Sequence, residues 1–173
     1  MEKMPSSEKL QIQKDSLQRA IDFIKFAEAK NGAAIAFASG MILAQLRLRA
    51  TIPELDIVQL SGLILALLGA LVSTKSFIPK LSFTSDAAAG VDTKGNLLFY
   101  GEIAKLSEEE FRSKFDSRYS DEGKLLEDYA NQVIANSKIA SEKMGHFSIA
   151  VLLIGGGGIM LLLDLAFQFF SKF

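Results

Sequence analysis

Hydrophobic residues gather in three long runs along the chain, and the longest lies closest to the C-terminus. Residues 147–170 contain one ionisable side chain, Asp164. A helix of about 20 apolar residues is long enough to cross the ~30 Å hydrocarbon core of a bilayer. The run therefore predicts a transmembrane helix, which we place at residues 146–171.

Two shorter apolar runs, residues 32–50 and 57–78, predict a transmembrane hairpin. The first is rich in Gly, Ala and Ser, which let helix backbones approach closely in lipid. Thr51 and Glu54, in the turn, have the spacing of a capping box, which predicts the start of the second helix. Pro79 predicts its end.

The segment before the first apolar run is polar and helical in pattern. Residues 1–31 predict a charged amphipathic helix with an apolar stripe, and no helix breaker separates it from the first span. We therefore expect one continuous helix. Packing of the stripe on another helix is favoured over a position on the membrane surface.

Residues 79–145 form a different kind of segment, beginning with a loop-like stretch. The apolar run at 96–101 predicts a strand or extended segment. Ser107 and Glu110 have capping-box spacing and predict a short helix. From about Gly123 a long helical pattern continues without a strong breaker into the last span.

Lys and Arg predict the orientation of these spans. Residues 1–31 hold six of them and residues 79–145 hold nine, whereas two lie at the hairpin turn and one follows the last run. The positive-inside rule places the N-terminus and the middle segment in the cytoplasm and the C-terminus outside. The fold class is therefore a mainly α membrane protein with three transmembrane helices, the first and last extended into the cytoplasm, and a small cytoplasmic insert between the second and third.

Composition limits the chemistry. The net charge of −1 gives no reason to expect a nucleic-acid polymer as partner. The chain has no cysteine and one histidine, His146, so we expect no metal site. No nucleophile elbow or phosphate-binding glycine loop is present, and we therefore predict a protein that is not an enzyme and has no cofactor.

The predicted spans contain two unusual polar or flexible features. Asp164 lies at a depth similar to that of Arg47 and Arg49, so we expect it either to pair with one of them or to reach interfacial water, with equal weight. The last span also holds four consecutive glycines that permit close helix contact or a kink, and we favour helix contact: Gly155, Gly156, Gly157 and Gly158.

Three segments together carry a family resemblance: AEAKNG at 27–32, NLLFYGEIAKLS at 96–107 and EDYANQ at 127–132. Their order and spacing resemble the PycTM family, the small membrane effectors of bacterial Pycsar anti-phage defence. The middle segment is the most specific. It departs from the family pattern in the order of Phe99 and Tyr100 and in having Glu102 in place of Asp.

The resemblance implies an effector of the bacterial inner membrane that acts as a homo-oligomer. Such effectors are switched on by a cyclic pyrimidine nucleotide, cCMP or cUMP, made by a partner cyclase after phage infection. Activation impairs the inner membrane and aborts the infection. A constitutive structural membrane protein whose cytoplasmic insert docks a partner is the alternative function.

A cyclic nucleotide needs a cation or N–H donors for its phosphate, an aromatic or apolar face for its base, and polar groups for the base edge and the ribose. We expect the 96–112 segment and adjoining helix ends to supply them, and the alternative is that this segment is core. The candidate ligand residues are Lys30, Asn96, Tyr100, Lys105, Arg112 and Gln132.

Overall fold

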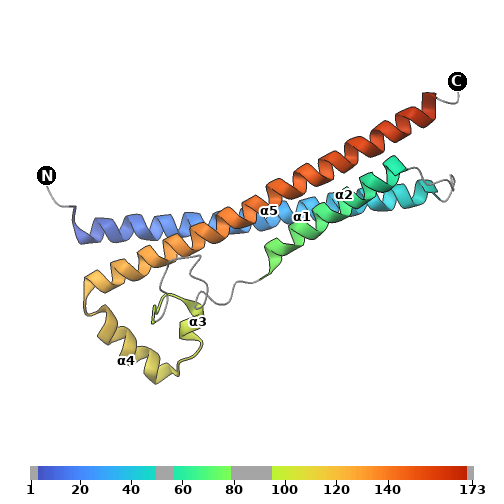
Figure 1. Ribbon diagram of the computed structural model, residues 1–173. Helices are drawn as coiled ribbons and strands as arrows, with labels where there is room; N and C mark the ends of the chain where they lie inside the picture. The colour runs from blue at the N-terminus through green and yellow to red at the C-terminus, as the bar shows by residue number, and fades with distance from the viewer. Residues whose placement is uncertain (1–3, 50–56, 79–94, 171–173) are drawn as a thin grey trace. The chain divides into compact units, whose positions relative to one another are not determined.

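The computed structural model describes residues 4–49, 57–78 and 95–170, and these residues form helices and turns without a strand (Figure 1). The order of elements is α1 (Ser6–Arg49), α2 (Ile57–Thr74), the 3₁₀-helix η1 (Lys75–Phe77), α3 (Tyr100–Ile103), α4 (Glu108–Tyr119) and α5 (Glu122–Phe170).

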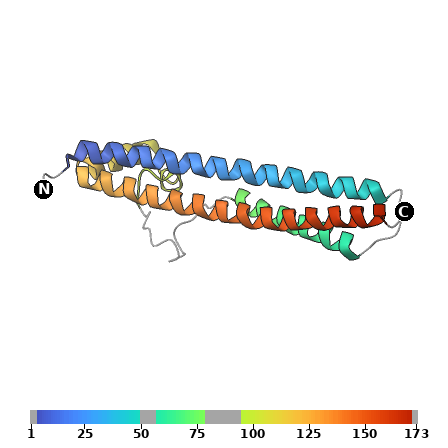
Figure 2. The ribbon, with the colours of Figure 1, turned by 90° about the horizontal axis from the view of Figure 1, so that it is seen from above.

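Both long helices are continuous, as the sequence predicted. α1 runs for 44 residues and α5 for 49 (Figure 2). Neither contains proline, and the glycines inside them lower helix propensity without removing a hydrogen-bond donor. The amphipathic N-terminal segment and the first apolar run therefore form one helix, and so do the last two segments.

One expectation is wrong, and another lies outside the described residues. The 96–101 run is not a strand. Leu97 and Leu98 lie in a turn, and one turn of α-helix, α3, starts at Tyr100. Apolar composition cannot distinguish a short buried turn from a strand. The proposed capping box of Thr51 lies outside the described residues.

The chain divides into two compact units. Unit 1 comprises residues 1–24 and 79–141, and unit 2 comprises residues 25–78 and 142–173. Two of the three boundaries fall inside α1 and α5, and the third follows Ile78, after η1. In unit 1 the apolar stripe of α1 is half-buried, and the ammonium of Lys14 lies 5.9 Å from the ring centroid of Tyr129 on α5.

Small residues form the core of unit 2. Ala34 and Ala38 of α1 pack with Ala150 and Ile154 of α5 in one buried cluster. Small side chains bring helix backbones close together, so many van der Waals contacts form without large side chains. This agrees with the Ala-rich and Gly-rich composition of the first apolar run.

Glycines from both helices lie in the contact between α2 and α5 in unit 2. A Cβ atom placed on Gly157 would lie 2.6 Å from the carbonyl oxygen of Gly62. A Cβ on Gly69 would lie 2.5 Å from Cγ1 of Ile154. By contrast, a Cβ on Gly155 would meet nothing within 4 Å. The four consecutive glycines are therefore not equivalent.

Lys143 joins three elements of unit 2. Its ammonium donates to the carboxylate of Glu28 on α1 at 2.8 Å and to the carbonyl oxygen of Ser76 in η1. The buried side-chain amide of Asn31 donates to the carbonyl oxygens of Ala27 and Lys143 at 2.9 and 3.0 Å. These bonds hold the end of α2 and η1 against both long helices.

Candidate ligand site

A predicted capping box starts α4. The Ser107 side chain accepts a hydrogen bond from the backbone N–H of Glu110 at 3.3 Å, and the Glu110 carboxylate accepts one from the Ser107 backbone N–H at 2.9 Å. Each bond satisfies an N–H group that the helix itself cannot pair. These hydrogen bonds lower the pKa of Glu110 below its ordinary value of 4.5, with the backbone bond contributing most.

Ser107→Ala is expected to destabilise unit 1 by about 1 kcal/mol, because it removes one half of the cap, whereas Ser107→Thr should cost little. Thermal unfolding of the detergent-solubilised protein, followed by helical circular dichroism, measures this.

The stability of unit 1 should also depend on pH through Glu110. Because the folded pKa of Glu110 is lowered, its contribution to the stability of unit 1 is present above pH 4.5 and is lost as the pH falls below that value. Glu110→Gln should lack this loss, and an unchanged acid dependence in that variant would contradict the assignment.

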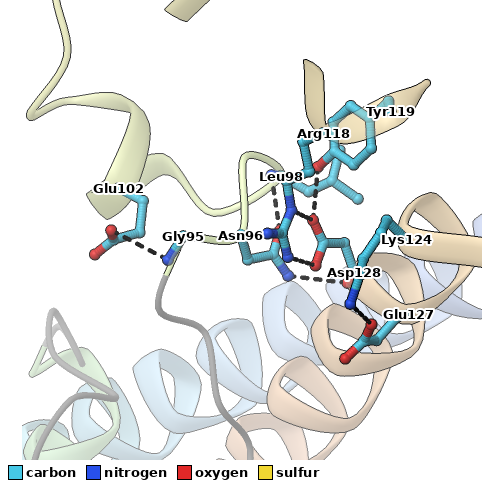
Figure 3. Close-up of polar contacts among 9 residues, drawn as sticks. All are labelled: Gly95, Asn96, Leu98, Glu102, Arg118, Tyr119, Lys124, Glu127 and Asp128. Carbon is cyan, nitrogen blue, oxygen red and sulfur yellow. Dashed lines mark hydrogen bonds and ion pairs between the residues drawn. The ribbon is translucent and has the colours of Figure 1, made fainter. Parts of the chain in front are cut away.

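Asp128, near the start of α5, is the centre of a buried hydrogen-bond network in unit 1 (Figure 3). Its side chain is 1% exposed and accepts two hydrogen bonds from the Arg118 guanidinium, each 2.7 Å long. The phenol of Tyr119 donates a third at 2.8 Å. A bidentate arginine–carboxylate pair fixes both side chains in one geometry, so the end of α4 is fastened to α5.

The network also holds the turn before α3 (Figure 3). The Asn96 side-chain amide donates to the backbone carbonyl of Asp128 at 3.0 Å, and its oxygen accepts from the Leu98 N–H at 2.8 Å. The preceding Gly95 has a φ of +74°, a conformation that a side chain would strain. Two of the three segments that carry the family resemblance, 96–107 and 127–132, therefore meet at Asp128.

The network sets the charge states of its members. The hydrogen bond to Asp128 raises the pKa of Arg118, so its guanidinium stays charged. Burial raises the pKa of the Tyr119 phenol, and the hydrogen bond to Asp128 raises it further. Tyr119 therefore remains a neutral donor at physiological pH, and the network has one cation opposite one anion.

A cavity of about 870 Å³ lies beside this network in unit 1. Its lining combines cationic, carboxylate, hydroxyl and apolar groups from the turn, α3, α4 and the start of α5: Gly95, Leu97, Glu102, Lys105, Leu106, Ser113, Lys114, Ser117, Arg118, Asp121 and Lys124. The volume lies within the range of about 300–1,000 Å³ that is usual for small-molecule sites.

The cations that line the cavity differ in how they are paired. Lys105 bonds to Glu102, Lys124 donates to Glu127 at 2.9 Å, and Arg118 is held by Asp128. The hydrogen bond to Glu127 raises the pKa of Lys124. Lys114 makes no ion pair within the described part of the chain, although its charge helps to lower the pKa of Glu110, one turn earlier on α4. It is therefore the lining cation with the most freedom to bind an anion.

The structure places the six candidate ligand residues in different surroundings. Lys105 alone lines the cavity. Asn96 and Gln132 are buried, Tyr100 is 58% exposed, and Arg112 is exposed and bonded to Glu108 at 2.6 Å. Lys30 belongs to unit 2. As the alternative interpretation expected, Leu97 and Phe99 are buried.

Sequence reasoning missed most of the cavity lining. Ser113, Lys114, Ser117 and Arg118 recur at i, i+1, i+4 and i+5 and so lie on one side of α4. A helix face with hydroxyl and cationic groups at this spacing was the sequence signal for an anion site. The signal is weak, because a charged helix face is usually only solvated.

The polar groups of the predicted spans lie in unit 2. Asp164 is 4% exposed and accepts a hydrogen bond from the Gln168 amide at 3.0 Å, and the buried pair Gln59 and Gln45 joins α2 to α1 at 2.9 Å. The Arg47 side chain is exposed, and that of Arg49 is outside the described residues. Pairing of Asp164 with either arginine stays a prediction.

Glycines 155 to 158 of the last span also differ in exposure. Gly157 is buried and Gly155 is exposed, whereas the remaining two, Gly156 and Gly158, are half-buried. Leu65 and Met41 are the nearest side chains to those two. The run therefore packs closely against α2 at Gly157 and leaves an open surface at Gly155.

Two of the helices have the length and composition of membrane spans. Among the described residues, two helical segments, Ile57–Phe77 and Glu122–Phe170, are long and apolar enough to cross a membrane by length and composition. The first apolar run is not one of these two. The chain is thus mainly α, with features consistent with a membrane protein and a cation-lined cavity.

The chain belongs to the PycTM family. Residues 12–170 match the family described as the Pycsar effector protein domain, which confirms the family predicted from the three segments. Membership implies an anti-phage defence effector. The match covers residues of both units.

Individual relatives agree with this assignment. The chain is 32% identical over 160 residues to the Pycsar effector protein RsPycTM of a Rhizobium species, covering 86% of this chain and 90% of the relative. It is 28% identical over 152 residues to the Pycsar effector protein PtPycTM of Propioniciclava tarda, covering 84% and 72%. No solved structure gives a significant match.

Proposed function

We propose that this protein is a non-enzymatic defence effector that binds a cyclic pyrimidine nucleotide, cCMP or cUMP, and then impairs the bacterial inner membrane as a homo-oligomer. The observation that carries this proposal is the family match over residues 12–170. The cavity of unit 1 supports the ligand part. The apolar helices support the membrane part.

The groups around the cavity suit the parts of a cyclic nucleotide. The phosphate carries one negative charge, which Lys114 and Arg118 attract and to which Ser113 and Ser117 donate hydrogen bonds. Leu97 and Leu106 supply apolar contact for the base. Two carboxylates, Glu102 and Asp121, accept hydrogen bonds from the ribose hydroxyl or a base amine.

The proposed topology has three spans, residues 32–50, 57–78 and 146–171. The excess of Lys and Arg in residues 1–31 and 79–145 places both segments in the cytoplasm and the C-terminus outside. The cavity of unit 1 is formed by residues 95–124 and would then face the cytoplasm, where a cyclase product is found.

Lys114→Gln is expected to weaken binding of cCMP or cUMP by about tenfold or more, since a hydrogen bond to a charged group contributes about 1.5–3 kcal/mol. Titration calorimetry of the full-length protein in detergent measures this. Arg112→Gln is the matched control, because it removes a cation from the same helix that does not line the cavity. Equal losses in both variants would contradict a site at the cavity, and no binding by the unmodified protein would remove the ligand proposal.

Membrane impairment is tested in cells that express the protein with or without a pyrimidine cyclase. Dye uptake and growth arrest should require both the protein and the cyclase. Lys114→Gln should reduce both effects. Growth that is indifferent to the cyclase would favour the alternative of a constitutive structural protein whose cytoplasmic part docks a partner.

A further inference from the structure

A second hollow lies in unit 2, between the first apolar run of α1 and the last run of α5. It has a volume of about 290 Å³, and its lining includes Lys30, Ala34, Phe37, Phe147, Ile154 and Gly155. Ala34 and Ile154 are buried and form its floor, whereas Phe37 is 65% exposed and forms a wall. Apart from Lys30, every lining side chain is apolar or absent.

The one cation stands at the end of the groove that lies next to the charged part of α1. The Lys30 ammonium lies 4.7 Å from the ring centroid of Phe26 and 5.0 Å from that of Phe147. Aromatic faces attract a cation and restrict its position without neutralising it. Within the described part of the chain Lys30 makes no ion pair, so its positive charge is available.

The groove runs along both helices and is open at a glycine. Residues 30–37 of α1 and 147–155 of α5 each span about 10–12 Å at about 1.5 Å per residue. A Cβ on Gly155 would meet nothing within 4 Å, so open space lies over this glycine. An apolar channel of this length with a cation at one end matches a molecule that has an anionic head and a hydrocarbon tail.

We propose that this groove binds an anionic phospholipid of the cytoplasmic leaflet, with the phosphate at Lys30 and the upper part of one acyl chain along Phe147, Ile154 and Gly155. The proposal rests on the membrane topology proposed above. Charge complementarity favours a lipid over a helix from a second copy, because an apolar helix surface would leave the Lys30 ammonium without a partner. An anionic nucleotide would leave the apolar walls without contact.

Native mass spectrometry of the full-length protein in mild detergent, with added phosphatidylglycerol or phosphatidylcholine of the same acyl chains, tests the proposal. One cation near a membrane surface contributes about 1 kcal/mol to binding of anionic lipid, so we expect about a fivefold preference for phosphatidylglycerol. Lys30→Gln should abolish the preference, so that the two lipids are retained equally.

Filling the groove gives a second measurement. Gly155→Leu is expected to reduce retention of both lipids at least fivefold. Gly40→Leu is the matched control, because Gly40 is also an exposed helical glycine whose Cβ would meet nothing within 4 Å and it does not line the groove. If Gly155→Leu fails to fold, the lipid preference of Lys30→Gln still tests whether the groove binds an anionic lipid.

Several outcomes would overturn the proposal. These are an unchanged lipid preference in Lys30→Gln, equal losses in the two leucine variants, or a change in subunit number without a change in bound lipid, which would assign the groove to a second copy. Membrane fractionation of the same protein separates this failure from failure of the topology. A membrane-embedded protein without lipid preference refutes only the groove.

Discussion

Asp128→Ala is expected to destabilise unit 1 by about 3 kcal/mol, the low end of the cost of removing one partner of a buried ion pair. The low end applies because the Arg118 side chain is 29% exposed and can regain water, whereas the Asp128 side chain is 1% exposed. The substitution also leaves the phenol of Tyr119 without its acceptor. Loss of helical circular dichroism on heating measures the effect.

The same substitution should weaken nucleotide binding, because Arg118 lines the cavity and loses the carboxylate that orients it. Asp116→Ala is the matched control, since it removes an exposed aspartate from α4. The melting temperature and nucleotide affinity of Asp128→Asn should lie between those of the two alanine variants, because an amide keeps one acceptor and loses the charge. If Asp128→Ala melted at the temperature of Asp116→Ala, the network would not hold unit 1 together.

Gly157→Ala is expected to destabilise unit 2 by about 1–3 kcal/mol through overpacking. The added Cβ would lie 2.6 Å from the carbonyl oxygen of Gly62 and 3.2 Å from the backbone nitrogen of Ala66. Backbone atoms cannot move aside as a flexible side chain can, so α2 and α5 must separate. Thermal unfolding in detergent, with size-exclusion chromatography of the heated protein, measures this.

Gly155→Ala provides the matched control, because the same change two residues earlier meets nothing within 4 Å. It should be neutral or stabilise the helix by up to about 1 kcal/mol, the difference in helix propensity between the two residues. Similar melting of the two variants would show that α2 and α5 do not pack as closely as these distances require.

Local patterns in the sequence predicted most of the helical structure. The start of α4 follows from Ser107 and Glu110 alone, since a capping box needs only residues three apart. The continuity of α1 and α5 follows from the absence of proline in either segment. The 96–101 segment was the exception, because its short apolar run is compatible with either a strand or a buried turn.

The candidate site was predicted less well, for a physical reason. Lys105 was found, but Lys114 and Arg118 were not, because their role depends on a cavity that the turn, α3, α4 and the start of α5 form together. Asp128 was noted only as part of a family-like segment. Its position opposite Arg118 and Asn96 requires contacts across 10 and 32 residues, which no local spacing encodes.

Periodicity, length and motif order were therefore enough to predict the helices, the apolar segments long enough for a membrane, and the family. Three properties emerged only from the folded chain: which of four adjacent glycines lies against another backbone, which lysines line a cavity, and which aspartate joins α4 to α5. Those properties depend on the neighbours that each residue meets in space, and chemically identical residues in one run can meet different neighbours.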